Sequence, residues 1–213
     1  MPTPGGGVVA RMTLSFTVTW DYRCPFARNV HEHLLNGLAG GADWDVRFAP
    51  FSLGQVHVAE GEPDVWDEPG KDTGILALQA GVYVRDHLPD RFPAVHRALF
   101  ATRHDEGRKL NEPEVVRGVL DAHGVPADEV FAAIEDGTVL KQIRTEHEAL
   151  VGSHNVWGVP TFISGDEAVF VRIMDRAPEG TDPARSRSTI ERIVTMLETW
   201  PDLNEFKHTS IKR

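Results

Sequence analysis

Cysteine is almost missing from this sequence, which contains Cys24 and no other among its 213 residues. A single cysteine excludes an intrachain disulfide, and a chain of this length can bury a sufficient core without one. A lone cysteine is also typical of a reducing compartment. Residues 1–12 are rich in glycine and proline and have no apolar stretch, so we expect a disordered leader there and not a signal peptide. The sequence therefore predicts a cytoplasmic protein.

Positive charge is scarce as well. Lys and Arg number 22 against 32 Asp and Glu, which gives a formal net charge of −10 and makes nucleic acid a poor partner. No apolar run reaches the length of a membrane span. The sequence also lacks a glycine-rich phosphate-binding motif and any group of ligands at metal-binding spacing. We therefore expect no membrane, nucleic acid, metal or bound cofactor.

One stretch, Thr17–Ala27, combines the end of a strand, a turn and the start of a helix. Apolar and polar side chains alternate around its beginning, which predicts a strand over residues 13–19. Proline is favoured at the first position of a helix, and apolar residues recur at helical spacing afterwards, which predicts a helix over Pro25–Leu38. Cys24 is therefore expected at the N-terminus of an amphipathic helix.

The position of Cys24 has a chemical consequence. The partial positive charge and unpaired N–H groups of a helix N-terminus favour a thiolate, and Arg23 and Arg28 add positive charge nearby. We therefore predict a lowered pKa for Cys24 and an exposed, nucleophilic sulfur. The alternative is that this cysteine is a small buried apolar residue, which is the commoner role. Asp21 is expected to cap the helix rather than to accept a proton.

The chain continues with a second strand and a helical region. Residues 44–49 predict a strand that is parallel to the first, because a strand, helix and strand of this length form a βαβ unit. Residues 54–74 predict a long loop, in which Trp66 is expected to be an anchor rather than a ring that stacks on a ligand. Five helices are expected over residues 75–150, with Asn111 as the N-cap of the third.

The sheet is expected to resume after these helices. Residues 156–163 lead into a strand, residues 165–166 form a turn of the hairpin type, and residues 168–171 form the next strand, so the two strands should be antiparallel. A polar loop is expected over residues 175–186, and a final amphipathic helix over residues 189–200.

Two motifs carry a resemblance to a known family. The run Trp20–Ala27, WDYRCPFA, is similar to the active-site turn D-x-x-C-P-W-C, and Gly158–Phe162, GVPTF, is similar to the cis-proline loop that accompanies it. Over most of residues 13–200 the chain resembles the DsbA-like thioredoxin superfamily. The resemblance is to the cytoplasmic branch of FrnE proteins, kappa-class glutathione transferases and 2-hydroxychromene-2-carboxylate isomerases, above all to actinobacterial mycothiol-dependent reductases.

This resemblance implies an α/β protein with a thioredoxin-like fold and an inserted all-helical domain. The segments that follow from it are a disordered leader over 1–12, a thioredoxin-like domain over 13–53 and 151–200, a loop with the helical insertion over 54–150, and a C-terminal tail over 201–213.

The resemblance also implies the residues of the site. The peptide bond between Val159 and Pro160 is expected to be cis and to lie beside the catalytic Cys24, so that the backbone before the proline can pair with an extended thiol ligand. The residues expected to bind substrate are Pro25, Phe26, Val159, Pro160, Thr161, Trp157 and His104. His104 lies in a polar turn for which a solvated role is equally open, and Trp157 either packs under the loop or lines a pocket.

Further polar residues are weaker candidates. His147 and His154 precede the proline loop, and a histidine near Cys24 could move a proton, although a surface role is the default. The last strand is followed by a basic segment that contains Arg172, Arg176, Arg185 and Arg187. A solvated loop is the favoured interpretation of this segment, and an anionic ligand is the alternative.

One departure from the family pattern is informative. Ala27 stands where the family often has a second cysteine, and alanine cannot resolve a mixed disulfide. The sequence therefore predicts a monothiol cycle, in which Cys24 attacks a disulfide or a small organic substrate and a low-molecular-weight thiol of the mycothiol or glutathione type then releases it. The same departure argues against a disulfide-forming oxidant.

Three functions remain open at this point. The first is a monothiol oxidoreductase with a small thiol as cosubstrate. The second is a kappa-like transferase or isomerase, in which Cys24 takes the place of an activating serine. The third is a non-catalytic binding module, which Ala27 favours and the retained Cys24 and Pro160 oppose. A homodimer is possible in each case.

Overall fold

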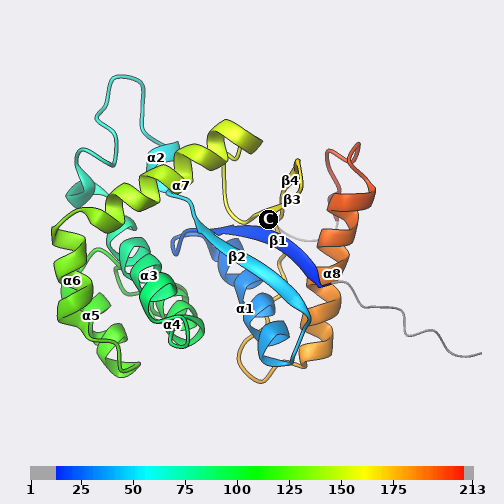
Figure 1. Ribbon diagram of the computed structural model, residues 1–213, viewed down its shortest axis with the longest axis horizontal. Coiled ribbons are helices and arrows are strands. Elements are labelled where there is room, and N and C mark those ends of the chain that lie inside the picture. The colour runs from blue at the N-terminus through cyan, green and yellow to red at the C-terminus, as the bar shows by residue number, and fades with distance from the viewer. Residues whose placement is uncertain (1–12, 209–213) are drawn as a thin grey trace, which may run out of the picture.

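The computed structural model describes residues 13–208 and contains a four-stranded sheet with helices packed around it (Figure 1). The strands are β1 (Leu14–Trp20), β2 (Trp44–Pro50), β3 (Thr161–Ser164) and β4 (Glu167–Phe170), in the order β2-β1-β3-β4. β1 and β2 are parallel, whereas β3 is antiparallel to both β1 and β4. The predicted βαβ unit and the predicted hairpin are therefore both present.

Helices account for most of the remaining chain. They are α1 (Pro25–Ala39), α2 (Leu53–Val56), α3 (Ile75–His87), α4 (Phe92–His104), α5 (Pro113–Ala122), α6 (Ala127–Glu135), α7 (Thr138–His154) and α8 (Pro183–Thr199), with a 3-10 turn, η1 (Pro69–Lys71). Figure 1 shows α3, α4, α5 and α6 gathered on one side of the sheet and α8 on the other. α7 runs from this helical block back to β2.

One face of the sheet is covered by α1 and α8. In the first half of β1, Phe16 is buried between the more exposed Ser15 and Thr17, whereas the end of the strand is buried throughout. Phe16 and Val18 belong to one buried cluster with Val30 of α1 and Ile190 of α8. One face of β1 is thus packed against helices along its length, and both faces are buried at its end. The cluster fixes the start of α1 relative to the end of β1, and this junction contains Cys24.

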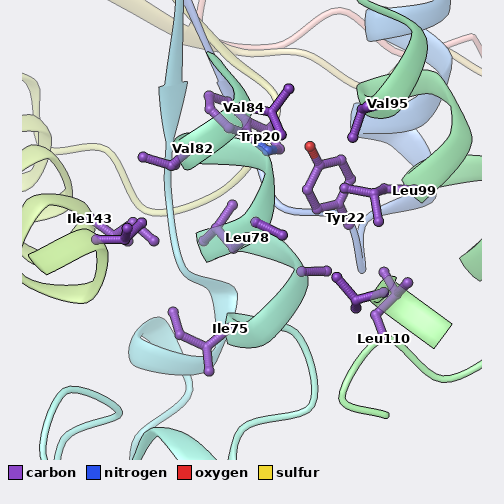
Figure 2. Packing of buried hydrophobic residues seen from close by; sticks show 14 of the residues in the cluster. Trp20, Tyr22, Ile75, Leu78, Val82, Val84, Val95, Leu99, Leu110 and Ile143 are labelled. Atoms are coloured by element: carbon purple, nitrogen blue, oxygen red, sulfur yellow. The ribbon is translucent and has the colours of Figure 1, made fainter. Parts of the chain in front are cut away.

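A second buried cluster joins the end of β1 to the helical block. Figure 2 shows the ring of Tyr22 between α3, which carries Leu78, and α4, which carries Leu99. Gly81 of α3 permits this approach, because a Cβ atom there would lie 2.3 Å from the Tyr22 hydroxyl oxygen. The turn before Cys24 is therefore anchored in the core that the sheet shares with the inserted helices.

A buried chain of hydrogen bonds runs through the same core. The carbonyl of Thr19 can only accept, so Nε2 of His31 donates to it at 3.2 Å. Nδ1 of His31 must then accept from Nε2 of His96 at 2.8 Å, and Nδ1 of His96 accepts from the Tyr22 hydroxyl at 2.8 Å. Burial lowers the pKa of both histidines, which keeps them neutral and fixes the direction of the chain.

Several predicted element boundaries need correction. α8 begins at Pro183 and not at residue 189, because the Asp182 side chain accepts a hydrogen bond from the Ala184 amide at 3.0 Å and proline follows at the first helical position. Glu112, not Asn111, is the N-cap residue of α5, and it makes no side-chain cap bond. The predicted loop over residues 54–74 contains η1 and all of α2 except its first residue, Leu53.

Other expectations can be placed on the structure. Trp66 is buried and its ring lies 5.4 Å from that of His147, as expected of a loop anchor. Helix α7 passes through residue 150, at which the predicted insertion ends, and the division into two domains stays a prediction. The predicted leader over residues 1–12 and the last residues of the tail lie outside the described residues.

Candidate active site

Cys24 is the N-cap residue of α1. Its backbone is extended, and its sulfur accepts a hydrogen bond from the Ala27 amide at 3.4 Å, as a capping side chain does. The thiol in turn donates to the carbonyl oxygen of Val159 at 3.2 Å. The sulfur therefore links the start of the helix to the loop that precedes β3, although these segments are far apart in the sequence.

Asp21 holds the turn that leads to Cys24. Its carboxylate is fully buried and accepts hydrogen bonds from the backbone amides of Arg23 and Leu53, each at 2.8 Å. It also pairs with the Arg23 guanidinium, which reaches on to Asp72 at 2.9 Å. The expectation that Asp21 caps α1 was wrong, because Cys24 occupies the capping position and Asp21 ties the turn to the start of α2.

His104 approaches the same turn from α4. Its Nε2 donates a hydrogen bond to the carbonyl oxygen of Tyr22 at 2.9 Å. Burial lowers the pKa of His104, and the charges of Arg28 and Arg103 act in the same direction. A neutral imidazole at this position supports the backbone of the turn two residues before Cys24.

The environment of Cys24 overturns the expectation of an exposed thiolate. The residue is 8% exposed and belongs to the buried cluster. Burial raises the pKa of the Cys24 thiol above its ordinary value, because a thiolate loses hydration there. The amides of Ala27 and Phe26 and the charge of Arg172 lower the pKa of the thiol, and Asp21 raises it, but burial dominates. The resting group is therefore a thiol at neutral pH.

The two cations that were expected to lower this pKa are engaged elsewhere. Arg23 pairs with Asp21 and Asp72, and Arg28 pairs with Asp105 at 2.9 Å. In each ion pair the negative charge of the carboxylate offsets the effect that the positive charge of the arginine would have on the Cys24 sulfur. Sequence proximity to Cys24 was therefore a poor guide to which arginine acts on it.

The loop opposite Cys24 has the geometry that the resemblance implied. The peptide bond between Val159 and Pro160 is cis. Thr161 fixes the loop, because its amide donates to the hydroxyl oxygen of Thr19 at 2.8 Å and its own hydroxyl donates to the carbonyl of Gly158 at 2.8 Å. These contacts place the Val159 carbonyl at the sulfur.

A group of aromatic side chains and one arginine lies around this loop. The Arg172 guanidinium lies over the ring of Phe26, 4.7 Å from its centroid, and 5.7 Å from that of Phe170. The Phe170 ring packs at 4.5 Å against Trp157, which is 63% exposed. Trp157 therefore does not pack under the loop but stands on the surface. Sequence reasoning missed Phe170, and it assigned Arg172 to a solvated loop.

The weaker candidates lie elsewhere. His147 is buried and its ring stacks on Phe51 at 4.1 Å, and burial lowers its pKa to about 4. Nε2 of His154 contacts the carbonyl of Gly165 in the hairpin turn. Neither histidine has a hydrogen bond to Cys24 among residues 13–208.

One hollow of the described structure lies away from Cys24. A hollow of about 690 Å³ lies between β2, α3 and α7 and is lined in part by Arg85 and Glu146, far along the chain from Cys24, which does not line it. Among residues 13–208, no helix is long and apolar enough to span a membrane. The same residues contain no group of three or more His, Cys, Asp or Glu side chains arranged to hold a metal ion.

Similarity to known proteins agrees with this architecture. The chain is 26% identical to the uncharacterised protein Rv2286c of Mycobacterium tuberculosis over 162 residues, which are 76% of this chain and 69% of the relative. The structure of this chain resembles that of the cytosolic disulfide reductase DsbM from Pseudomonas aeruginosa with GSH. The TM-score is 0.57 and the identity is 16%, over 85% of this chain and 100% of that one. The structure also resembles 2-hydroxychromene-2-carboxylate isomerase, with a TM-score of 0.59 and 15% identity over 90% of this chain and 100% of that one.

The family assignment rests on a match that covers most of the chain. Residues 17–177 match the model of the DSBA-like thioredoxin domain, and this segment contains both Cys24 and the loop at Pro160. The predicted fold class, α/β with a thioredoxin-like fold, is thereby confirmed. The chain belongs to the family of DSBA-like thioredoxin domains.

Proposed function

We propose that this protein is a cytoplasmic thiol-disulfide oxidoreductase of the DsbA family that works through Cys24 alone, with a low-molecular-weight thiol of the mycothiol or glutathione type as cosubstrate. The observation that carries the proposal is the pairing of a capping cysteine with Ala27. The Ala27 amide hydrogen-bonds the Cys24 sulfur at 3.4 Å, yet its methyl side chain offers no second thiol.

The proposed reaction has two exchanges. The Cys24 thiol loses its proton to solvent, and the thiolate attacks one sulfur of the substrate disulfide. A bond forms between Sγ and that sulfur, the original S–S bond breaks, and the other half leaves as a thiolate with the electron pair. A small thiolate then attacks the mixed disulfide and regenerates Cys24. That attack falls on the substrate sulfur, the bond between this sulfur and Sγ breaks, and Cys24 leaves with the electron pair. One half of the substrate is thus released as a thiol, and the other half ends in a mixed disulfide with the small thiol, from which a second small thiol releases it as a thiol and forms the disulfide of the small thiol.

The electrostatics favour reduction over disulfide formation. A strong oxidant of this family type owes its potential to a stabilised thiolate in the reduced form. In this protein burial raises the pKa of Cys24, so the thiolate is not stabilised in that way.

The structural comparisons support the same direction. DsbM from Pseudomonas aeruginosa, whose structure this chain resembles, is a cytosolic disulfide reductase in a structure with GSH. The small thiol must only be able to reach the mixed disulfide on Cys24. A peptide-like thiol of the glutathione type and a sugar-linked thiol of the mycothiol type both meet this requirement. The proposal therefore names the thiol by class and commits to Cys24 as the single site of attachment.

A second candidate is a thiol-dependent isomerase or transferase. The structural similarity to 2-hydroxychromene-2-carboxylate isomerase favours it. So does the protonated state of Cys24, because a thiol that donates to the Val159 carbonyl can also donate to a bound thiolate and stabilise it. In that mechanism Cys24 forms no covalent bond.

Mass spectrometry separates these candidates. The protein is incubated with oxidised glutathione or oxidised mycothiol, and the intact mass is recorded before and after addition of the reduced thiol. A removable adduct is expected on the wild type and not on a Cys24→Ser variant. If no adduct forms but the small thiol still binds, the isomerase or transferase is favoured. If neither occurs, the protein is a non-catalytic binding module and the proposal fails.

A further inference from the structure

The residues on either side of Arg172 are both hydrogen-bonded to segments that flank Cys24. The amide of the preceding residue, Val171, donates to the carbonyl of Pro160 at 2.9 Å. The carbonyl of the following residue, Ile173, accepts from the Asn29 side chain of α1 at 2.9 Å. The backbone of Arg172 is therefore fixed between the proline loop and the first turns of the helix that Cys24 caps.

The charge of Arg172 is not neutralised within the described chain. Among residues 13–208, Arg172 forms no ion pair with a carboxylate, whereas Arg28 pairs with Asp105 and Arg176 pairs with Glu32 and Asp105. Its positive charge acts on the Cys24 sulfur in the direction that lowers the pKa of the thiol. An unpaired cation thus lies within electrostatic reach of the reacting atom.

The neighbouring aromatic rings fix the orientation of the Arg172 guanidinium. Arg172 lies over the face of Phe26 at 4.7 Å, and cation–π contact of this kind holds a guanidinium while its N–H groups stay free. A planar guanidinium with free N–H groups matches a carboxylate with two parallel hydrogen bonds. Beyond it, Phe170 supports the exposed ring of Trp157, a surface on which a further ring can stack.

We propose that Arg172 and the rings of Phe26, Phe170 and Trp157 form the substrate subsite of Cys24, and that this subsite selects disulfides whose departing half carries a carboxylate on or near a planar aromatic ring. This inference rests on the function proposed above and adds the class of substrate. In the first exchange, Arg172 pairs with the carboxylate, Trp157 stacks on the ring, and the departing half leaves with the electron pair of the broken S–S bond.

The test compares the reaction of Cys24 with three disulfides. Dithiobis(nitrobenzoate) is aromatic and anionic, dithiodipyridine is aromatic and neutral, and dithiodiglycolate is aliphatic and anionic. Because Cys24 is the only cysteine, every rate reports on it. The measured quantity is the ratio of second-order rate constants for two disulfides on the same variant, which cancels any general change in the reactivity of the sulfur.

An Arg172→Gln variant should lower the ratio of dithiobis(nitrobenzoate) to dithiodipyridine by about three- to tenfold, the range expected for loss of one partly exposed ion pair with a cation–π contact. An Arg172→Lys variant should retain most of the preference, because it keeps the charge. A matched Arg192→Gln variant removes an exposed arginine from α8 and should leave the ratio unchanged. A Trp157→Ala variant should lower the ratio of dithiobis(nitrobenzoate) to dithiodiglycolate.

The outcomes separate this inference from the proposed function. An unchanged ratio in Arg172→Gln overturns the subsite. A loss in both Arg172→Lys and Arg192→Gln that is as large as the loss in Arg172→Gln overturns it as well. In either case Cys24 remains a reactive thiol. Failure of all three disulfides to modify the wild type overturns the proposed function, and the subsite falls with it.

Discussion

The sulfur of Cys24 lies 3.2 Å from the carbonyl oxygen of Val159 and donates its hydrogen to it. This hydrogen bond exists only in the thiol form. It therefore adds to the effect of burial, which already raises the pKa of Cys24. The site consequently stores the nucleophile in its protonated state, between the helix that the sulfur caps and the loop that faces it.

The reaction rate of Cys24 should continue to rise at pH values above those at which the rate of a free cysteine levels off. Because its pKa is raised, the thiolate fraction at neutral pH is smaller than that of an exposed cysteine, and the alkylation rate should still increase at pH values where a model cysteine, with a pKa of about 8.5, has levelled off. The rate with iodoacetamide, followed by intact mass, measures this. A plateau at or below the pH of the model thiol would contradict the prediction.

An Ala27→Cys variant should convert the site to a dithiol. Ala27 is fully buried three residues after Cys24, and its amide already contacts the sulfur at 3.4 Å. We expect the variant to form an intramolecular disulfide and to release bound substrate thiol without an added small thiol. An Ala27→Ser variant, which has nearly the same size, is the control and should still need the small thiol. If the wild type releases substrate equally well alone, the monothiol cycle is wrong.

A His104→Phe variant tests whether His104 positions the turn or binds substrate. Loss of the hydrogen bond to the Tyr22 carbonyl should lower the free energy of unfolding by about 1 kcal/mol. A His104→Gln variant retains a donor and should recover part of this loss in chemical denaturation. The ratios of rates between charged and neutral disulfides should stay as in the wild type. A changed ratio with unchanged stability would instead place His104 in the substrate site.

The burial of His147 should make folding stability depend on pH. The folded pKa is about 4, below the ordinary value of 6.5, so the unfolded chain binds the proton more readily. The stabilising contribution is thus complete above pH 6.5 and is lost as the pH falls toward 4. Over this range it amounts to about 3 kcal/mol, at about 1.4 kcal/mol for each pKa unit.

A His147→Phe variant provides the matching measurement. Nδ1 of His147 is buried without a hydrogen-bond partner in the described structure, and its ring stacks on Phe51, so phenylalanine keeps the stacking and removes the titrating group. The difference in unfolding free energy between pH 7 and pH 4 should shrink relative to the wild type. An equal difference in both proteins would show that His147 does not titrate in this way.

The sequence contained the local signals of the fold and of the reactive residue. Alternation along β1 and proline after Cys24 predicted the strand and the helix, because both depend on contacts between near neighbours in the chain. The motif at Pro160 marked the partner loop through resemblance. The start of α8 was missed even though Asp182 and Pro183 form a local cap, because the basic and proline-rich composition around them suggested a loop.

The tertiary structure alone decided the chemistry of the sulfur. Desolvation depends on every segment that packs over Cys24, and no spacing along the chain records how many do. Ion pairing is equally non-local, because Asp72 and Asp105 pair with Arg23 and Arg28, the arginines near Cys24 in sequence. Arg172, which is remote in sequence, lies over the ring of Phe26 without an ion pair among the described residues, and its charge acts on Cys24. The sequence by itself therefore determined where the thiol stands, and long-range packing determined its protonation state and the cation beside it.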